Sequence, residues 1–210
     1  MAHRCFISFK KEDKYYKEKI LEKLGDDQIK GKALDEWINS DDIEYIMQVI
    51  RRDYLKNTSV TLYLIGEHSS ENEGLDSKGY NKQNFVIREL QATLYDGENN
   101  RRNGLLGIVL PEMESKIFVG ESYCQACNKN HTLVNINDNT SIKEFSENYY
   151  LYPIQLGCYE SYNEDGRYCV KVRYSEFMND PDKYIEKAFE KTQDDISNKV
   201  HWRDIQHKGL

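Results

Sequence analysis

The sequence contains no apolar run that approaches the ~18 residues needed to span a membrane. Its first residues, MAHRCFISF, also lack the apolar stretch and small-residue cleavage site of a signal peptide. We therefore expect a cytoplasmic protein with no membrane partner.

Clustered positive charge is scarce as well. The 29 Lys and Arg residues are outnumbered by 36 Asp and Glu residues, which gives a net charge of −7. The arginine pairs at 51–52 and 101–102 are isolated along the chain. Proteins that bind duplex nucleic acid concentrate Lys and Arg against the phosphates. We therefore expect no nucleic-acid partner.

The five cysteines are an odd number, and in a cytoplasmic protein they are better interpreted as free thiols than as disulfides. Cys124 and Cys127 form a Cys-x-x-Cys pair that His131 follows, which is half of a zinc site. Cys158 is a candidate fourth ligand, but no second Cys-x-x-Cys accompanies it. The sequence therefore favours free thiols in a loop, and we expect no zinc or other cofactor.

Aromatic residues, by contrast, are abundant. Sixteen Tyr and seven Phe exclude a disordered chain. A chain of 210 residues can bury roughly 70% of its unfolded surface. We expect a single domain over residues 1–210.

Apolar runs alternate with amphipathic segments in the first half, up to residue 110. Strands are expected at residues 4–9, 32–37, 59–65 and 104–110. Helices are expected between them at residues 13–24, 42–56 and 81–95. This β-α-β-α-β-α-β order is typical of a doubly wound α/β domain with a parallel sheet.

The second half is less regular. Residues 111–180 are expected to hold an irregular insertion, a fifth strand at 149–156 and a hairpin strand at 167–174 after the turn sequence NEDG. Asp180 followed by Pro181 predicts the start of a C-terminal helix over 181–197, with Asp as the N-cap.

Ligands of an open parallel sheet bind beyond the carboxyl ends of its strands. No Gly-x-Gly-x-x-Gly follows a strand and no Gly-x-x-x-x-Gly-Lys-Ser/Thr occurs, which disfavours a dinucleotide oxidoreductase and a P-loop enzyme. Ser8 and Phe9 end the first predicted strand, and Asp35 and Trp37 lie in the second. An aromatic ring there can stack on a base or on nicotinamide, or can simply belong to the core.

Glu89 is the carboxylate that helical geometry singles out. At about 100° per residue, Val86, Ile87, Leu90 and Leu94 form the packed arc of their helix, and Glu89 lies on the shoulder of that arc. A half-desolvated carboxylate can bind ribose hydroxyls or stabilise an oxocarbenium-like centre when a glycosidic bond breaks. The alternative is an ordinary solvated glutamate.

The same segments, taken in order, resemble the motifs of TIR-like domains. The resemblance rests on RCFISF at 4–9, Asp35 with Trp37, NTSVTLYLIG at 57–66, FVIRE at 85–89 and GLLGIVL at 104–110. The set is most similar to the bacterial TIR-like family that includes the signal-producing subunit of Thoeris anti-phage defence. The resemblance covers about the first 110 residues and implies a flavodoxin-like sheet with helices on both faces.

Enzymatic members of this family cleave the nicotinamide–ribose bond of NAD and release, cyclise or conjugate ADP-ribose. The resemblance thus implies NAD as substrate, a second messenger, a downstream effector protein as partner, and activity that can require self-assembly or an infection cue. It assigns the catalytic role to Glu89. The substrate contacts that it implies are Ser8, Phe9, Asp35, Trp37 and, at a position where many members have Trp, Phe85.

Two other functions remain open on the sequence. One is a TIR-like interaction module without catalysis, which recruits a partner through the sheet edge or a helix. The other is an activity like that of nucleoside deoxyribosyltransferases, which also place a glutamate near an anomeric carbon on a similar sheet.

Overall fold

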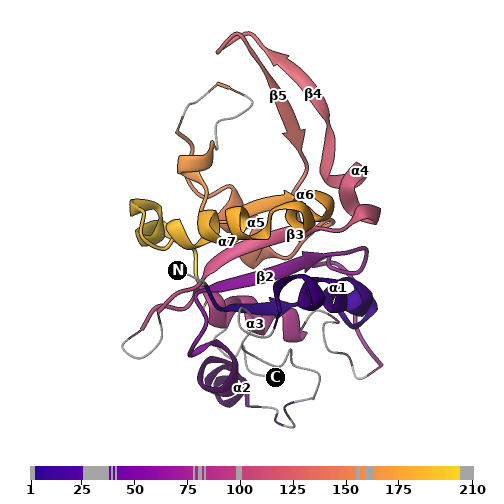
Figure 1. Ribbon diagram of the computed structural model, residues 1–210, viewed down its shortest axis with the longest axis vertical. Helices are drawn as coiled ribbons and strands as arrows, with labels where there is room; N and C mark the ends of the chain where they lie inside the picture. The colour runs from indigo at the N-terminus through magenta and orange to yellow at the C-terminus, as the bar shows by residue number, and fades with distance from the viewer. Residues whose placement is uncertain are drawn as a thin grey trace.

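The computed structural model describes residues 3–25, 38, 40, 42–77, 79, 82, 84–97, 101–154, 157–158 and 163–203. Its centre is a four-stranded parallel sheet with the order β1-β2-β3-β6 (Figure 1). The strands are β1 (Cys5–Ser8), β2 (Val60–Ile65), β3 (Gly104–Val109) and β6 (Val170–Arg173). The expected strand at 32–37 lies outside the described residues.

The first three strands are buried along their whole length, as their nearly continuous apolar content predicts for a parallel sheet covered on both faces. The first residues of the three strands lie side by side in the sheet, since Cys5 pairs with Val60 and Val60 pairs with Gly104. Gly104 lacks a side chain at a point where a Cβ would overlap the carbonyl oxygen of Ala188. The glycine therefore lets a helix approach the sheet closely.

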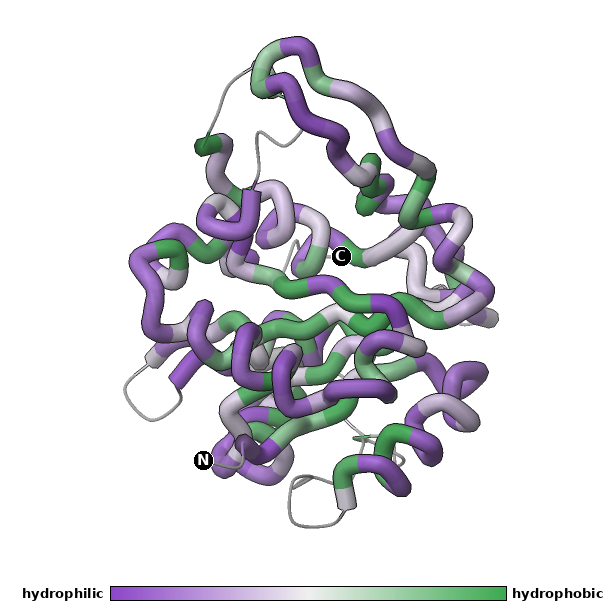
Figure 2. The backbone as a smooth tube through the Cα atoms, turned by 45° about the horizontal axis from the view of Figure 1, so that its top comes forward, coloured by the Kyte–Doolittle hydropathy of each residue, from purple (hydrophilic) through white to green (hydrophobic). Residues whose placement is uncertain are grey.

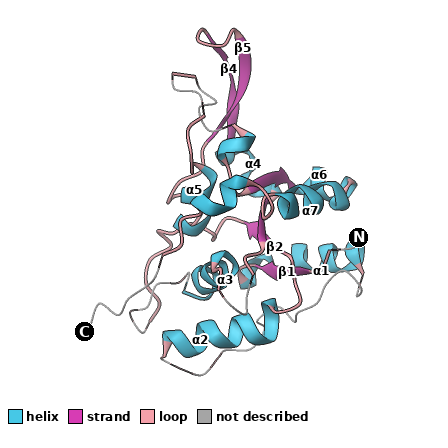
Figure 3. Ribbon diagram, turned by 90° about the vertical axis from the view of Figure 1, so that its left-hand side faces the viewer, coloured by secondary structure: helices cyan, strands magenta, loops and turns pink. Residues whose placement is uncertain are grey.

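Helices cover both faces of the sheet (Figures 1 and 3). One face packs against α1 (Lys14–Leu24), α6 (Tyr174–Asn179) and α7 (Pro181–Glu190). The other face packs against α3 (Asn84–Leu94) and α5 (Lys143–Tyr149). Beside α3 lies α2 (Ile43–Val49), which continues as a π-helical segment, Ile50–Leu55. Figure 2 shows the hydrophobic strands enclosed by these more polar helices. The predicted doubly wound α/β fold is therefore confirmed.

An antiparallel hairpin projects away from the sheet (Figure 1). It consists of β4 (Phe118–Cys124) and β5 (Lys129–Val134), and the short helix α4 (Glu114–Ile117) precedes it. The insertion expected to be irregular thus contains ordered structure. The remaining short 3₁₀ helices are Lys11–Asp13, Pro111–Met113, Glu164–Gly166 and Asp195–Lys199.

Two predictions for the second half are wrong. The expected fifth strand at 149–156 is instead the end of α5, and the described residues that follow, up to 154, contain no strand. The expected hairpin strand at 167–174 is β6, which pairs in parallel with β3. Its alternating pattern arises because Val170 and Val172 pack under α6 and α7, whereas Lys171 and Arg173 lie over the ring of Phe118. Alternation indicates a strand but not the direction of its partner.

The predicted start of the C-terminal helix is confirmed. The side chain of Asp180 accepts a hydrogen bond from the backbone N–H of Lys183 at 3.3 Å, and Pro181 is the first helical residue. The helix α7 ends at Glu190, earlier than expected, and a separate 3₁₀ helix follows at Asp195–Lys199.

Candidate functional site

The candidate site lies at the carboxyl end of β1, on the face that α3 covers. Alternation along the strand places Ser8 on the same face as Phe6, which packs against the α2–α3 layer. Glu89 and Thr93 lie one turn apart on α3 and face this sheet. The hydroxyl of Ser8 donates to Oε2 of Glu89 at 2.6 Å, and the hydroxyls of Thr93 and Thr61 lie 2.9 Å apart. Two polar contacts therefore fix α3 against the sheet.

The carboxyl group of Glu89 is buried more deeply than its helical position predicts. Glu89 is 4% exposed and Ser8 is fully buried. Burial raises the pKa of Glu89 from 4.5 to about 8, and the hydrogen bond from Ser8 opposes part of that increase. Near neutral pH, much of Glu89 is therefore in its neutral form. A carboxyl group whose pKa is raised by burial is typical of catalytic acids and bases, and buried structural networks also contain such groups.

The structure brings Ser8 and Glu89 together, but not every residue that the resemblance implied. Phe9 packs with the α1 layer on the opposite face, where Nζ of Lys17 lies 4.8 Å from the centre of its ring. Phe85 is half-buried on α3, one turn before Glu89. The other two implied residues, Asp35 and Trp37, lie outside the described residues.

Asp13 is a second buried carboxyl group at the carboxyl edge of the sheet, and sequence reasoning missed it. Asp13 is 4% exposed and packs on Gly66, directly after β2, where a Cβ would overlap its carboxylate. Burial, followed by the charges of Glu112 and Glu12, raises the pKa of Asp13 to about 7. The helical pattern predicted only that a helix begins at Asp13. Because Asp13 follows the first strand closely in the sequence, its position could have indicated a place at the carboxyl edge of the sheet.

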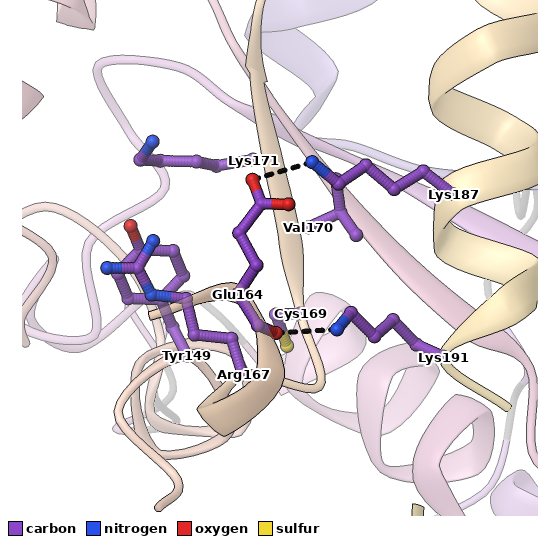
Figure 4. Close-up of a pocket in the computed structure, with 8 residues that line it drawn as sticks. All are labelled: Tyr149, Glu164, Arg167, Cys169, Val170, Lys171, Lys187 and Lys191. Carbon is purple, nitrogen blue, oxygen red and sulfur yellow. Dashed lines mark hydrogen bonds and ion pairs between the residues drawn. The ribbon is translucent and has the colours of Figure 1, made fainter. Parts of the chain in front are cut away.

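A pocket opens elsewhere, between β6 and α7, and four of its eight lining residues are basic (Figure 4). Its lining residues are Tyr149, Glu164, Arg167, Cys169, Val170, Lys171, Lys187 and Lys191. The side chain of Glu164 accepts from Lys187 at 2.6 Å, and its carbonyl oxygen accepts from Lys191 at 2.5 Å. Glu164 thus offsets part of the positive charge. Of the residues implied by the resemblance, the four that the structure describes (Ser8, Phe9, Phe85 and Glu89) do not line this pocket.

Three of the four candidate metal ligands lie in the projecting hairpin. Cys124 ends β4, Cys127 lies in the following turn and His131 is in β5. The structure places Cys158 beside them, so that all four side chains form one cluster.

The C-terminal segment supports the helix that carries Glu89. The indole N–H of Trp202 donates to the carbonyl oxygen of Gln91 at 3.1 Å, and the side chain of Gln91 donates to Glu144 at 3.0 Å. Arg203 completes the network by bonding both carboxylate oxygens of Glu144 at 2.6 Å. The side chain of Glu144 is only 1% exposed, so its charge depends on these partners.

Replacing Arg203 with Ala is expected to lower the free energy of unfolding by about 2 kcal/mol, because it removes the charged donors that hold the buried carboxylate of Glu144 and leaves the side-chain amide of Gln91. The loss is smaller than for a fully buried pair, since the side chain of Arg203 is 32% exposed. Urea denaturation measures the change. The control is Arg52→Ala, which breaks the exposed pair with Asp53 and should leave the free energy of unfolding nearly unchanged. Equal losses for the two variants would contradict the assigned role.

Comparison with known protein families gives a match to the TIR-like domain of Thoeris protein ThsB over residues 6–115. The match covers more than half of the chain and includes most of β1 and all of β2, α3 and β3, and with them Ser8 and Glu89. No curated protein and no solved structure matches the chain. Within the described ranges, no helix combines the length and apolar content that a membrane crossing demands.

Proposed function

The chain belongs to the Thoeris ThsB TIR-like family, which gives it a TIR-related defence role, and we propose that it carries out this role by consuming NAD. In this proposal the protein cleaves the nicotinamide–ribose bond and converts the ADP-ribosyl group into a second messenger for an effector protein. The observation that carries the proposal is the buried Glu89 carboxyl group. It lies at the carboxyl end of a parallel strand and accepts a hydrogen bond from Ser8.

The proposed reaction breaks the bond between the anomeric carbon of the ribose and the pyridinium nitrogen. The bonding electron pair leaves with nicotinamide, which departs as a neutral molecule. The sugar then carries the positive charge as an oxocarbenium-like centre, and ionised Glu89 stabilises it. A hydroxyl group of water, of the ribose or of a second molecule captures this centre and loses its proton.

The raised pKa of Glu89 fits this reaction. A positively charged pyridinium close to the carboxyl group favours ionisation, so that substrate binding lowers the pKa that burial raises. The attraction between carboxylate and cationic sugar is stronger in a site from which water is excluded. Ser8 holds the carboxylate in one orientation and so acts as a positioning residue.

The test is to incubate the purified chain with NAD, alone and with the small-molecule fraction of a phage-infected cell extract. Chromatography measures nicotinamide, and mass spectrometry identifies the ADP-ribosyl product. We expect the two to appear in equal amounts, and heat-denatured protein to give neither. Absence of turnover in both conditions would contradict the proposal and favour an interaction module. Base exchange between deoxynucleosides, without NAD cleavage, would favour a deoxyribosyltransferase-like enzyme.

A further inference from the structure

Four potential metal ligands converge in the β4–β5 hairpin. Cys124, Cys127, His131 and Cys158 each offer one ligand atom, and these atoms all lie within 4.8 Å of one another. Three of them come from a short stretch of the hairpin, and Cys158 comes from a segment far along the chain. Only the tertiary structure could show that this fourth side chain points to the same place.

The distances between the ligand atoms suit a tetrahedral zinc ion. The sulfur of Cys158 lies 3.6 Å from the sulfur of Cys127 and 3.7 Å from that of Cys124. Two thiolates bound to one tetrahedral zinc, each at ~2.3 Å from the metal, are about 3.8 Å apart. Nε2 of His131 lies 3.3 Å from the sulfur of Cys158 and 2.8 Å from that of Cys127. If the nitrogen of His131 moved slightly away from both sulfurs, a zinc ion would fit among the four ligand atoms.

The turn between the strands has the shape that brings a Cys-x-x-Cys pair onto one centre. The backbone N–H of Asn128 donates to the carbonyl oxygen of Cys124 at 2.8 Å, which closes the turn. Asn128 has a φ of 56°, a left-handed conformation that asparagine tolerates better than most residues. The chain therefore turns back directly after Cys127.

Burial in the hairpin is confined to the candidate ligands. Along β4 and β5, Cys124 and His131 are the buried residues, whereas Val119 and Tyr123 are 52% and 56% exposed. An isolated two-stranded hairpin is marginally stable in water without a packed apolar face. A metal ion bound by Cys124 and His131 would supply the missing stabilisation.

We propose that Cys124, Cys127, His131 and Cys158 bind one Zn²⁺ in a structural site. Three thiolates and an imidazole are the soft ligands that zinc prefers, and four protein ligands close its coordination sphere. Binding displaces three thiol protons to solvent and involves no change of oxidation state. The ion joins the hairpin to the segment that contains Cys158. This assignment replaces the free-thiol interpretation, which the spacing of the cysteines had favoured.

The first experiment measures metal content in the full chain, expressed with added zinc and purified without a chelator. We expect about one zinc per chain by mass spectrometry of the metal. Co²⁺ added to reduced, metal-free protein should give the absorption bands of tetrahedral thiolate coordination. A zinc content near zero together with no such bands would overturn the proposal. A protein mass that reveals a disulfide among these cysteines after purification under reducing conditions would also overturn it.

The second experiment compares cysteine variants. Cys158→Ala should weaken zinc binding at least tenfold in competition with a chelator. The matched control is Cys169→Ala, which removes a buried thiol outside the cluster and should retain one zinc. Equal zinc affinity in the two variants would contradict the assignment.

The third experiment tests the structural role without relying on a variant that folds. Lys129 is exposed at the start of β5, and trypsin cleaves after lysine. Removing zinc from the wild-type chain should increase cleavage at Lys129 at least tenfold, and adding zinc back should reverse the increase. Unchanged cleavage would exclude a stabilising role. Because none of these measurements uses NAD, their outcome is independent of the proposed enzymatic function.

Discussion

Replacing Glu89 with Gln is expected to reduce the release of nicotinamide from NAD by at least about 100-fold, if the carboxylate stabilises the cationic sugar as proposed. Glutamine has nearly the same size, and its amide oxygen can still accept the hydrogen bond that Ser8 donates to Glu89 at 2.6 Å. The substitution therefore removes the ionisable group while retaining the local packing. Chromatography of nicotinamide under saturating NAD measures the effect.

The loss should appear mainly in kcat, because the positive charge lies on the pyridinium ring in bound NAD and develops on the ribose only in the transition state. The control is Glu18→Gln in α1, where the side chain is 55% exposed and should not contribute to the reaction. Equal rates for wild type and Glu89→Gln would remove Glu89 from its proposed role. A matching loss in Glu18→Gln would show that the assay responds to something other than the buried carboxyl group.

The same variant is expected to be more stable than the wild type at alkaline pH. The pKa of Glu89 is about 8 in the folded chain, against a usual 4.5. Between these values the folded chain holds a proton that the unfolded chain has released, so wild-type stability falls as pH rises and then levels off above about 8. Each unit of that difference corresponds to about 1.4 kcal/mol, so the full effect is on the order of several kcal/mol.

Urea denaturation of wild type and Glu89→Gln between pH 5 and 9 measures this difference. We expect the advantage of the variant to grow with pH up to about 8 and then to stay constant. The pKa of Asp13 is also raised, to about 7, but Asp13 is present in both proteins and its contribution cancels in the comparison. A difference that does not change with pH would contradict the buried, protonated state of Glu89.

These two results would support each other. A variant that is more stable and yet inactive has not lost activity by unfolding. The stability that wild type gives up by burying an ionisable group at this position would then be a cost of function, as is common at active sites.

The described part of the first half of the fold was predictable because local pattern and tertiary environment agree there. The apolar runs that form β1, β2 and β3 are buried on both faces. Such runs indicate buried strands even when the neighbouring strands are not known. The period of α3 also placed Glu89 beside the packed arc of the helix. Sequence reasoning still underestimated its burial, because the cover over Glu89 comes from Ser8 and the sheet, which are distant along the chain.

The second half was predicted less well because local pattern is ambiguous there. The alternation in β6 is compatible with a parallel or an antiparallel edge strand. Only its pairing with β3 shows that the strand is parallel. Phe145 and Tyr149 are fully buried in α5, although the apolar content near Tyr149 suggested a strand. The contacts that decide these elements join residues far apart in sequence.

The sequence by itself determined the parallel α/β core, because strand and helix periods are local properties of the chain. Its ordered motifs indicated the family, and the resemblance to that family pointed to Glu89. Only the tertiary structure decided which side chains meet. It paired Ser8 with Glu89, put Phe9 on the opposite face and placed Cys158 beside Cys124, Cys127 and His131. The physical reason is that the desolvation that shifts a pKa and the convergence that creates a metal site both depend on neighbours that the chain supplies from distant positions.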